Sequence, residues 1–333
     1  VDGESDYAME IIRVENITIN NSIFENHSSA ITTKSGYNHE DALGHLFSVH
    51  IKNSTFRNNQ NGVYFPLNQK ALVDFQLTGN KFISNNYGIH IYGNTFGARI
   101  IKNNISNNIF YNNSAAMYFG NIQETCSTTG GTSSCGITSV LKEKYGLSDE
   151  EYPLRINKNI IVNTKEAQNA GNINEILFDN GSLSSNGKID FSNNIIKTLA
   201  GGVQIIYNNS RGTFIKNNYF ETGLGVLEMI KNDTESYSAK KVTFSENTLG
   251  LKKENNTDFY LSLSADENVI NSNNFPKADS LIYNNSKYAV IGENNYWGTT
   301  IESEVKTAIY DFLDDFDLGA VDYTPFLTIP NIT

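Results

Sequence analysis

The 333-residue chain contains no stretch near the roughly 20 consecutive apolar residues that a membrane span needs, so we expect no membrane insertion. It also has no basic stripe. There are 25 Lys and Arg against 36 Asp and Glu, a formal net charge of -11, and the arginines are scattered. Phosphate binding needs clustered positive charge, so nucleic acid is excluded as a partner. The chain begins at Val1 without an initiator Met or an apolar leader, which indicates a piece of a longer or processed protein.

Proline, methionine and tryptophan are scarce, at 5, 3 and 1 residues, whereas asparagine and isoleucine are abundant, at 48 and 35 residues. Asn is unfavourable inside helices and depleted from strands, while Ile favours strands. A chain rich in both is therefore expected to alternate strands with tight Asn turns. The composition predicts an all-β repeat.

The repeat is visible when each Asn-rich turn is aligned on the apolar residue that follows it. Ten such anchors recur about 22 to 25 residues apart once insertions are removed, which is typical of a solenoid. The anchors are Phe24, Phe56, Phe82, Phe110, Ile161, Ile196, Phe220, Leu249, Phe275 and Trp297.

Each unit holds three short segments of alternating polarity, as in residues 47–51, 55–56 and 62–65. Three strands and three corners in about 22 residues predict a right-handed parallel β-helix, here of about ten coils over residues 1–299. Inward apolar residues are expected to stack in columns. Corner asparagines are expected to adopt left-handed backbone and to form amide ladders between coils.

The pattern changes after residue 299. Apolar residues from Ile301 to Phe316 recur with helical spacing, Thr299 and Glu302 have the spacing of a capping box, and Gly319 would end the helix. We therefore predict an amphipathic capping helix over residues 300–318 and an extended tail within a C-terminal region of residues 300–333. Such a helix would cover the exposed strand edges of the last coil.

Residues 294–299, 310–316 and 321–327 resemble the terminal coil and cap of parallel β-helix repeat proteins on prokaryotic surfaces. The Asn-Ile-Lys-rich composition is most similar to that of adhesin-like proteins of methanogenic archaea. The resemblance covers the coils from about Met9 to Gly298. It implies an extracellular, cell-surface, monomeric repeat module. It leaves the activity open, because this architecture carries lyases, epimerases, hydrolases, phage tailspikes and non-catalytic adhesins.

Insertions follow the third strand of several units, at residues 33–46, 66–70, 93–98, 120–153 and 231–239. Loops inserted at one corner of a solenoid build one face, which is often the binding face. The largest insertion carries Cys126 and Cys135 around a Gly/Ser-rich segment. This spacing predicts a local disulfide, with two free thiols as the alternative.

Aromatic residues lie at equivalent places in successive third strands. With Val63, Ile89 and Met117 inward, strand alternation turns the residues after them outward, at strand spacing. These residues are Tyr64, His90 and Tyr118, and Tyr92 and Tyr260 are expected to extend the column. Such a column can stack against sugar rings. The alternative is that the loops fold over it and bury it as a small core.

Two acidic segments raise the question of a metal. His39, Glu40, Asp41 and His45 are side chains of the types that bind divalent metals, with surface histidines placed by chance as the alternative. Asp311, Asp314, Asp315 and Asp317 could hold Ca²⁺, but they lack the alternating pattern of a calcium loop. We predict no cofactor, with Ca²⁺ left open, and assign the second group to the solvated face of the helix.

These features predict a non-catalytic adhesin-like module that binds a polysaccharide or glycoprotein on another cell through the loop-bearing face. A polysaccharide lyase or epimerase in the same groove is the first alternative, and a structural spacer is the second. The hydrolase signatures of this architecture are absent from the coils. An acidic chain also repels a polyanionic substrate unless cations bridge the two.

Overall fold

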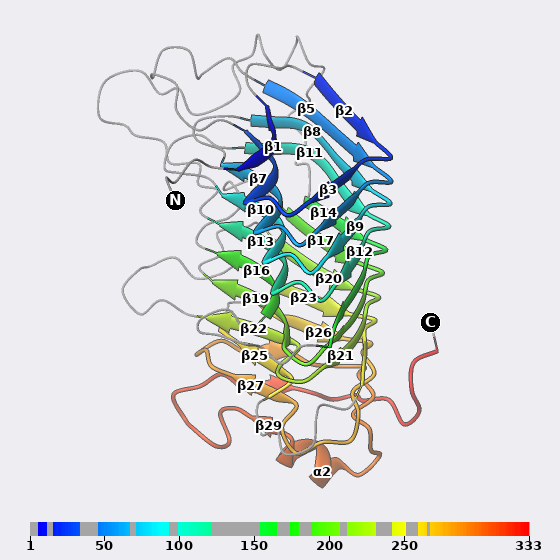
Figure 1. Cartoon of the computed structure of the whole chain (residues 1–333). Coiled ribbons are helices and arrows are strands. Elements are labelled where there is room, and N and C mark those ends of the chain that lie inside the picture. The colour runs from blue at the N-terminus through cyan, green and yellow to red at the C-terminus, as the bar shows by residue number, and fades with distance from the viewer. Residues whose placement is uncertain are drawn as a thin grey trace, which may run out of the picture.

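The computed structural model describes residues 6–11, 16–33, 46–66, 71–92, 99–120, 154–164, 174–179, 188–206, 212–230, 242–250, 259–264 and 267–332. These residues form three parallel sheets stacked along one elongated body, two of which run its whole length (Figure 1). Cys126 and Cys135 lie outside the described residues, as does most of each predicted insertion, so the disulfide stays a prediction.

Sheet A and sheet B each contain eleven strands, and sheet C contains eight. Sheet A consists of β1 (Tyr7–Ile11), β4 (Ser29–Thr33), β7 (Asn61–Pro66), β10 (Tyr87–Tyr92), β13 (Ala115–Gly120), β16 (Asn174–Asp179), β19 (Gly201–Ile206), β22 (Leu227–Ile230), β25 (Leu261–Leu263), β27 (Ile282–Asn284) and β29 (Ile309–Tyr310). Sheet B consists of β2 (Asn16–Asn20), β5 (Leu46–Lys52), β8 (Ala71–Thr78), β11 (Arg99–Ser106), β14 (Leu154–Asn157), β17 (Lys188–Ser192), β20 (Gly212–Lys216), β23 (Val242–Ser245), β26 (Val269–Asn271), β28 (Val290–Ile291) and β30 (Val321–Asp322). Sheet C consists of β3 (Ile23–Glu25), β6 (Thr55–Arg57), β9 (Lys81–Ile83), β12 (Ile109–Tyr111), β15 (Ile160–Asn163), β18 (Ile195–Thr198), β21 (Tyr219–Thr222) and β24 (Thr248–Leu249).

The chain visits sheets B, C and A in turn and then begins the next coil, which makes the fold a parallel β-solenoid. The all-β repeat prediction is confirmed. The predicted count of about ten coils is wrong, because the regular solenoid has about seven turns. Beyond β24 the third side is reduced to single bridges, from Thr248 to Asn274 and from Asn274 to Tyr296, so the last two anchors lie outside regular three-sided coils.

The corners between sheets B and C carry the predicted asparagine ladder. The first corner residue has left-handed backbone, with φ near 50–60° at Asn107, Asn193 and Asn217, for example. The next residue is buried, and its amide bonds to the coils on both sides. The ladder contains Asn80, Asn108, Asn159, Asn194, Asn218, Asn247, Asn273 and Asn295.

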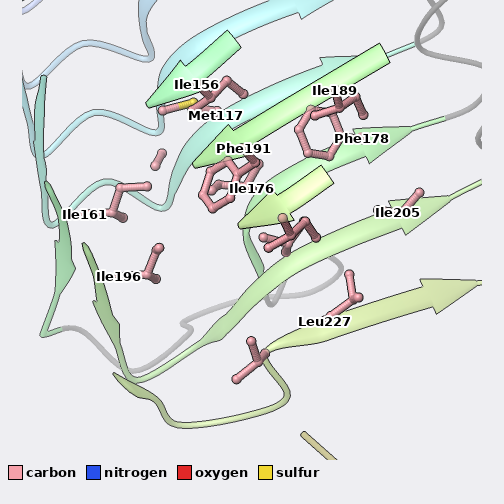
Figure 2. Close-up of a cluster of buried hydrophobic side chains, with 14 of the residues drawn as sticks. Met117, Ile156, Ile161, Ile176, Phe178, Ile189, Phe191, Ile196, Ile205 and Leu227 are labelled. Atoms are coloured by element: carbon pink, nitrogen blue, oxygen red, sulfur yellow. The ribbon is translucent and has the colours of Figure 1, made fainter. Parts of the chain in front are cut away.

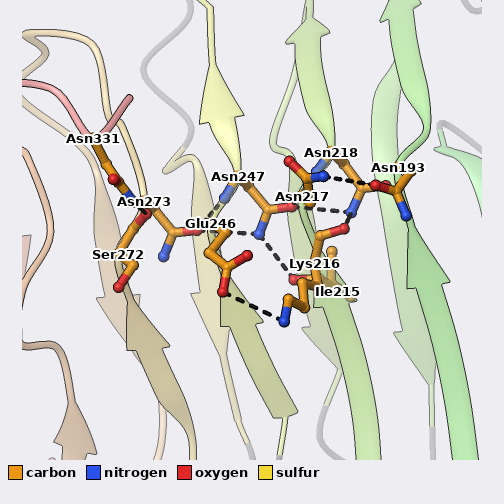
Figure 3. Close-up of polar contacts among 10 residues, drawn as sticks. All are labelled: Asn193, Ile215, Lys216, Asn217, Asn218, Glu246, Asn247, Ser272, Asn273 and Asn331. Carbon is orange, nitrogen blue, oxygen red and sulfur yellow. Dashed lines mark hydrogen bonds and ion pairs between the residues drawn. The ribbon is translucent and has the colours of Figure 1, made fainter. Parts of the chain in front are cut away.

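Figure 3 shows how one ladder member is held. The Asn247 Oδ1 accepts the backbone N–H of Asn218 at 2.9 Å and its amide at 3.0 Å. The Asn247 amide donates to the Ile215 carbonyl at 2.9 Å and to Asn273 Oδ1 at 3.1 Å. The side-chain amide of Asn247 therefore uses both its oxygen and its nitrogen, as a buried polar group requires.

The interior is filled by apolar columns, as the repeat predicts. On sheet C the rings of Phe24, Phe56, Phe82 and Phe110 stack with centroids 4.8–5.2 Å apart and planes within 10° of parallel. Figure 2 shows a stretch of the same core between the three sheets, where Ile161 and Ile196 from sheet C face Phe178 and Phe191. Side chains from all three sheets thus share one continuous core.

The predicted helix over residues 300–318 is not confirmed. Helix α2 covers only Glu302–Thr307, its N-cap Ile301 has no side-chain capping bond, and β29 follows directly. Ile309 pairs with Ile282 of β27 and is buried, whereas Leu313 and Phe316 are 71% and 81% exposed. The free edge of sheet A takes up this segment because an added strand satisfies its unpaired backbone groups. β29 and β30 therefore continue sheets A and B beyond residue 299.

The single described helix is too short to cross a membrane.

Candidate ligand-binding face

The outer face of sheet A brings most of the predicted aromatic residues together. His90 on β10 pairs in register with Tyr64 on β7 and with Tyr118 on β13. All three side chains are half-buried. These three residues therefore form one column across three neighbouring coils.

The rings contact one another in tilted and edge-on pairs. The His90 centroid lies 4.8 Å from that of Tyr64, 4.9 Å from that of Tyr118 and 6.4 Å from that of Tyr92. Tyr87, which the sequence analysis did not select, lies 4.8 Å from His90 and 5.8 Å from Tyr118. We call these five residues, Tyr64, Tyr87, His90, Tyr92 and Tyr118, the N-terminal aromatic cluster.

A hydrogen bond fixes the central ring of this cluster. His90 Nδ1 lies 3.0 Å from Asn61 Oδ1, and the Asn61 amide donates to the Ser28 carbonyl and to Ser29 Oγ. Because the Asn61 side-chain nitrogen donates to Ser28 and Ser29, the Asn61 oxygen faces His90 and accepts a hydrogen bond from it. The proton of the His90 ring is therefore on Nδ1. Burial lowers the pKa of His90 to about 4. The ring is therefore neutral at physiological pH.

Burial also raises the pKa of Tyr64, and the nearby Tyr7 and Tyr92 add to this effect. The cluster thus carries no charge at neutral pH and offers ring faces together with phenolic hydroxyls. Gly120, two residues after Tyr118, makes room for the Tyr118 ring, because a Cβ at that position would overlap the ring. Chemically, the arrangement suits an uncharged ligand with both apolar and hydroxyl surfaces.

No family model, no curated protein and no solved structure matches this chain.

Tyr260 does not belong to the column, contrary to the prediction. It is 2% exposed and lies in the core. Strand alternation fails at this place because two consecutive residues of each sheet A strand point inward near the corner with sheet C. At the equivalent positions of earlier coils, a Cβ on Gly62 or Gly88 would touch the inward rings of Phe82 or Phe110. The same irregularity turns Tyr87 outward, although alternation from Ile89 places it inward.

The two segments considered for metal binding give no metal site in the described residues. The segment with His39, Glu40, Asp41 and His45 lies outside them. The carboxylate of Asp311 instead accepts the backbone N–H groups of Leu313 and Val321, at 3.0 and 2.7 Å. Asp314 accepts the N–H of Asp311, and Asp315 that of Asp317. These side chains, predicted to lie on a helix face, shape the turn between β29 and β30. Nowhere in the described ranges do three or more His, Cys, Asp or Glu side chains group to hold a metal ion.

The exposed face of sheet C carries an apolar column that the sequence analysis did not select. Ile109, Ile160 and Ile195 pair with one another in register and are 39–41% exposed. β-branched residues favour strands and pack well across neighbouring strands. Stabilisation of the sheet accounts for this column.

Glu175 is the most perturbed carboxyl group and lies inside the protein, 1% exposed. Burial raises its pKa to about 7, although donors in contact with it oppose the rise. The Asn163 amide and the Thr198 hydroxyl donate to Glu175 Oε1 at 2.9 and 2.7 Å, and the backbone N–H of Ala116 also donates. No ligand can reach a group this deeply buried, so its role is structural.

Glu175 should make the stability of the protein depend on pH. Its folded pKa is raised above the ordinary value of 4.5, so its contribution is complete below about pH 4.5 and is lost as pH rises through about 7. We expect Glu175→Gln to reduce the fall in unfolding free energy between pH 5 and 8 by about 1–3 kcal/mol. Urea titrations at both pH values measure this difference. Identical pH dependence in the two proteins would contradict it.

Proposed function

We propose that this β-solenoid is a non-catalytic, carbohydrate-binding module of an extracellular, cell-surface protein, and that it binds through the N-terminal aromatic cluster. The observation that carries the proposal is the set of half-buried rings held around His90 on the outer face of sheet A. The partner would be a polysaccharide or glycoprotein on another cell. Right-handed winding belongs to this proposal, because crossovers between parallel strands are right-handed in almost all proteins.

The chemistry of the cluster supports a sugar ligand. Aromatic faces pack against the C–H faces of sugar rings, while hydroxyl groups bond to sugar hydroxyls. Tyr64, Tyr92 and Tyr118 supply both, and the neutral His90 keeps a ring nitrogen opposite the one bonded to Asn61. The formal net charge of -11 favours a neutral glycan over a polyanionic one.

The first experiment is a glycan array with the purified protein, with and without Ca²⁺, repeated with a Tyr64→Ala/Tyr118→Ala double variant. Each ring that stacks on a sugar contributes about 1 kcal/mol, so the double variant should bind about 30-fold more weakly. The matched control is Tyr111→Ala, because Tyr111 is 43% exposed and lies on sheet C. The control should bind as the wild type does.

Three results would overturn the proposal. If the protein binds no glycan on the array, a structural spacer explains the fold better. If the wild type and the double variant bind a glycan equally well, the binding site lies elsewhere. Cleaved or epimerised sugar, detected by mass spectrometry, would make the protein an enzyme.

The binding should also be insensitive to pH over the physiological range. His90 remains neutral down to about pH 4, so its protonation does not change the cluster between pH 8 and 5. Titrations of the best array ligand at pH 5, 6.5 and 8 should give affinities that agree within about twofold. A loss of affinity centred near pH 6.5, the ordinary pKa of histidine, would contradict this assignment.

A further inference from the structure

The outer face of sheet A carries a second group of aromatic side chains near the C-terminal end of the solenoid. Phe259, Tyr283 and Tyr310 lie in three successive coils, and we call them the C-terminal aromatic cluster. The centroid of Tyr283 is 5.4 Å from that of Phe259 and 5.3 Å from that of Tyr310. Phe259 and Tyr283 are half-buried, and Tyr310 is 38% exposed.

The two clusters share two equivalent positions of the repeat. Ile89 of β10 and Leu261 of β25 occupy the same position in their strands, because five successive strand pairings connect them in register. Tyr87 and Phe259 each lie two residues before these positions. Tyr118 and Tyr283 each lie one coil further on, on the outer face.

One ring contact is common to the two clusters. Tyr87 packs on Tyr118 at 5.8 Å, as Phe259 packs on Tyr283 at 5.4 Å. The edge-on pair of Tyr283 and Tyr310 has no counterpart in the first cluster, because Leu177 stands in the place of Tyr310. Ser262 stands in the place of His90, which leaves a smaller side chain beside Tyr283, and Glu228 stands in the place of Tyr64.

Polar side chains lie near the second cluster. Ser262 lies in its column, and half-buried Glu228 lies one coil before Ser262. The Tyr283 hydroxyl faces Asn285 Oδ1 at 3.4 Å. Rings next to hydroxyl, amide and carboxylate groups are the combination that recognises a sugar.

The size of the cluster favours a small ligand over a protein partner. Three partly buried rings expose only a few hundred Å². A stable protein interface needs roughly 800 Å² on each side, with an apolar centre.

We propose that Phe259, Tyr283 and Tyr310 form a second, independent carbohydrate-binding site, so that the module binds a neutral glycan surface bivalently. This inference rests on the proposed function. Tyr118 and Tyr283 are separated by five strand steps, or about 24 Å. Leu177 and Gln204, between them in the column, are only 3% and 7% exposed, so the two clusters do not merge into one open surface.

Bivalency has a measurable consequence. A short oligosaccharide cannot span both clusters, so it should bind each with its own affinity. A surface coated with many copies of the same sugar should hold the wild type at least tenfold more tightly than a protein with one site, because the second contact forms within the same complex.

The test uses NMR of the full chain with labelled tyrosine rings, titrated with cellotriose and with triacetylchitotriose. Two groups of ring signals should shift, one from Tyr64 and Tyr118 and one from Tyr283 and Tyr310. A Tyr283→Ala/Tyr310→Ala variant should lose the second response and keep the affinity of the first site within about twofold. The same variant should leave a surface coated with the trisaccharide at least tenfold faster than the wild type, and Tyr111→Ala should not.

The outcomes separate the two proposals. If only Tyr64 and Tyr118 respond, and the Tyr283→Ala/Tyr310→Ala variant is retained like the wild type, the second site is overturned and the proposed function stands. If only Tyr283 and Tyr310 respond, the glycan-binding site has been placed at the wrong end. If neither trisaccharide shifts any ring signal at millimolar concentration, both proposals are contradicted.

Discussion

Replacing Asn159 with alanine is expected to lower the free energy of unfolding by about 3–5 kcal/mol, because one side chain serves three coils. Its Oδ1 accepts the backbone N–H and the amide of Asn108, each at 3.0 Å. Its amide donates to the Ile105 carbonyl at 2.9 Å and to Asn194 Oδ1 at 3.0 Å. Alanine leaves a backbone donor and a backbone acceptor buried without partners, and each such group costs about 1–3 kcal/mol.

The matched control is Asn157→Ala in the same coil. Asn157 is half-buried at the end of β14 and donates one hydrogen bond, to Asn104 Oδ1 at 3.2 Å. Water can replace that contact, so the expected loss is below about 1 kcal/mol. Urea unfolding followed by circular dichroism compares the two variants. Equal losses would show that the ladder contributes no more than an ordinary surface amide.

In a solenoid each coil contacts only its neighbours, so the damage should also be local. Hydrogen exchange should speed up first in β12, β15 and β18, which flank the altered corner. Uniform acceleration along the whole chain would instead indicate that the coils unfold as one unit.

The corners explain why so much of the fold could be predicted. A residue with left-handed backbone followed by a buried Asn is a local requirement, and it recurs in almost every coil. The repeat therefore revealed the strands, the corners and the inward Phe column together. Long-range information was not needed, because neighbouring coils are built alike.

Other features depended on contacts that the pattern does not encode. The apolar spacing after residue 300 fits a helix, yet Ile309 joins the free edge of sheet A. The number of turns was overestimated because the Asn-rich corners continue through Asn273 and Asn295 after the regular third strand has ended. The Asn repeat in the sequence therefore extends further along the chain than the regular three-sided coils do.

The candidate site was predicted in part for a related reason. Period-two alternation placed Tyr64, His90 and Tyr118 correctly, and Tyr92 joined them. It failed for Tyr87 and Tyr260, because two consecutive residues face inward where the chain leaves the corner. Small residues such as Gly62 and Gly88 mark this place, and they are the signal that would have located the irregularity.

Replacing Phe82 with alanine should cost about 3–5 kcal/mol, since the ring is fully buried and stacked on both sides. Its centroid lies 5.0 Å from that of Phe56 and 4.8 Å from that of Phe110. Adjacent coils are held at strand spacing by their hydrogen bonds, so they cannot close the space that the missing ring leaves. The variant should therefore carry a cavity as well as lose apolar burial.

Two further variants separate ring stacking from simple burial at this position. Phe82→Leu keeps most of the volume and should cost less than half as much as Phe82→Ala. Ile109→Ala, on the neighbouring strand but 39% exposed, should cost about 1 kcal/mol or less. Thermal and urea unfolding of the three proteins decide the order. If Phe82→Leu is as damaging as Phe82→Ala, parallel stacking contributes stability beyond the filling of space, and the continuous column from Phe24 to Phe110 stabilises the first coils as a unit.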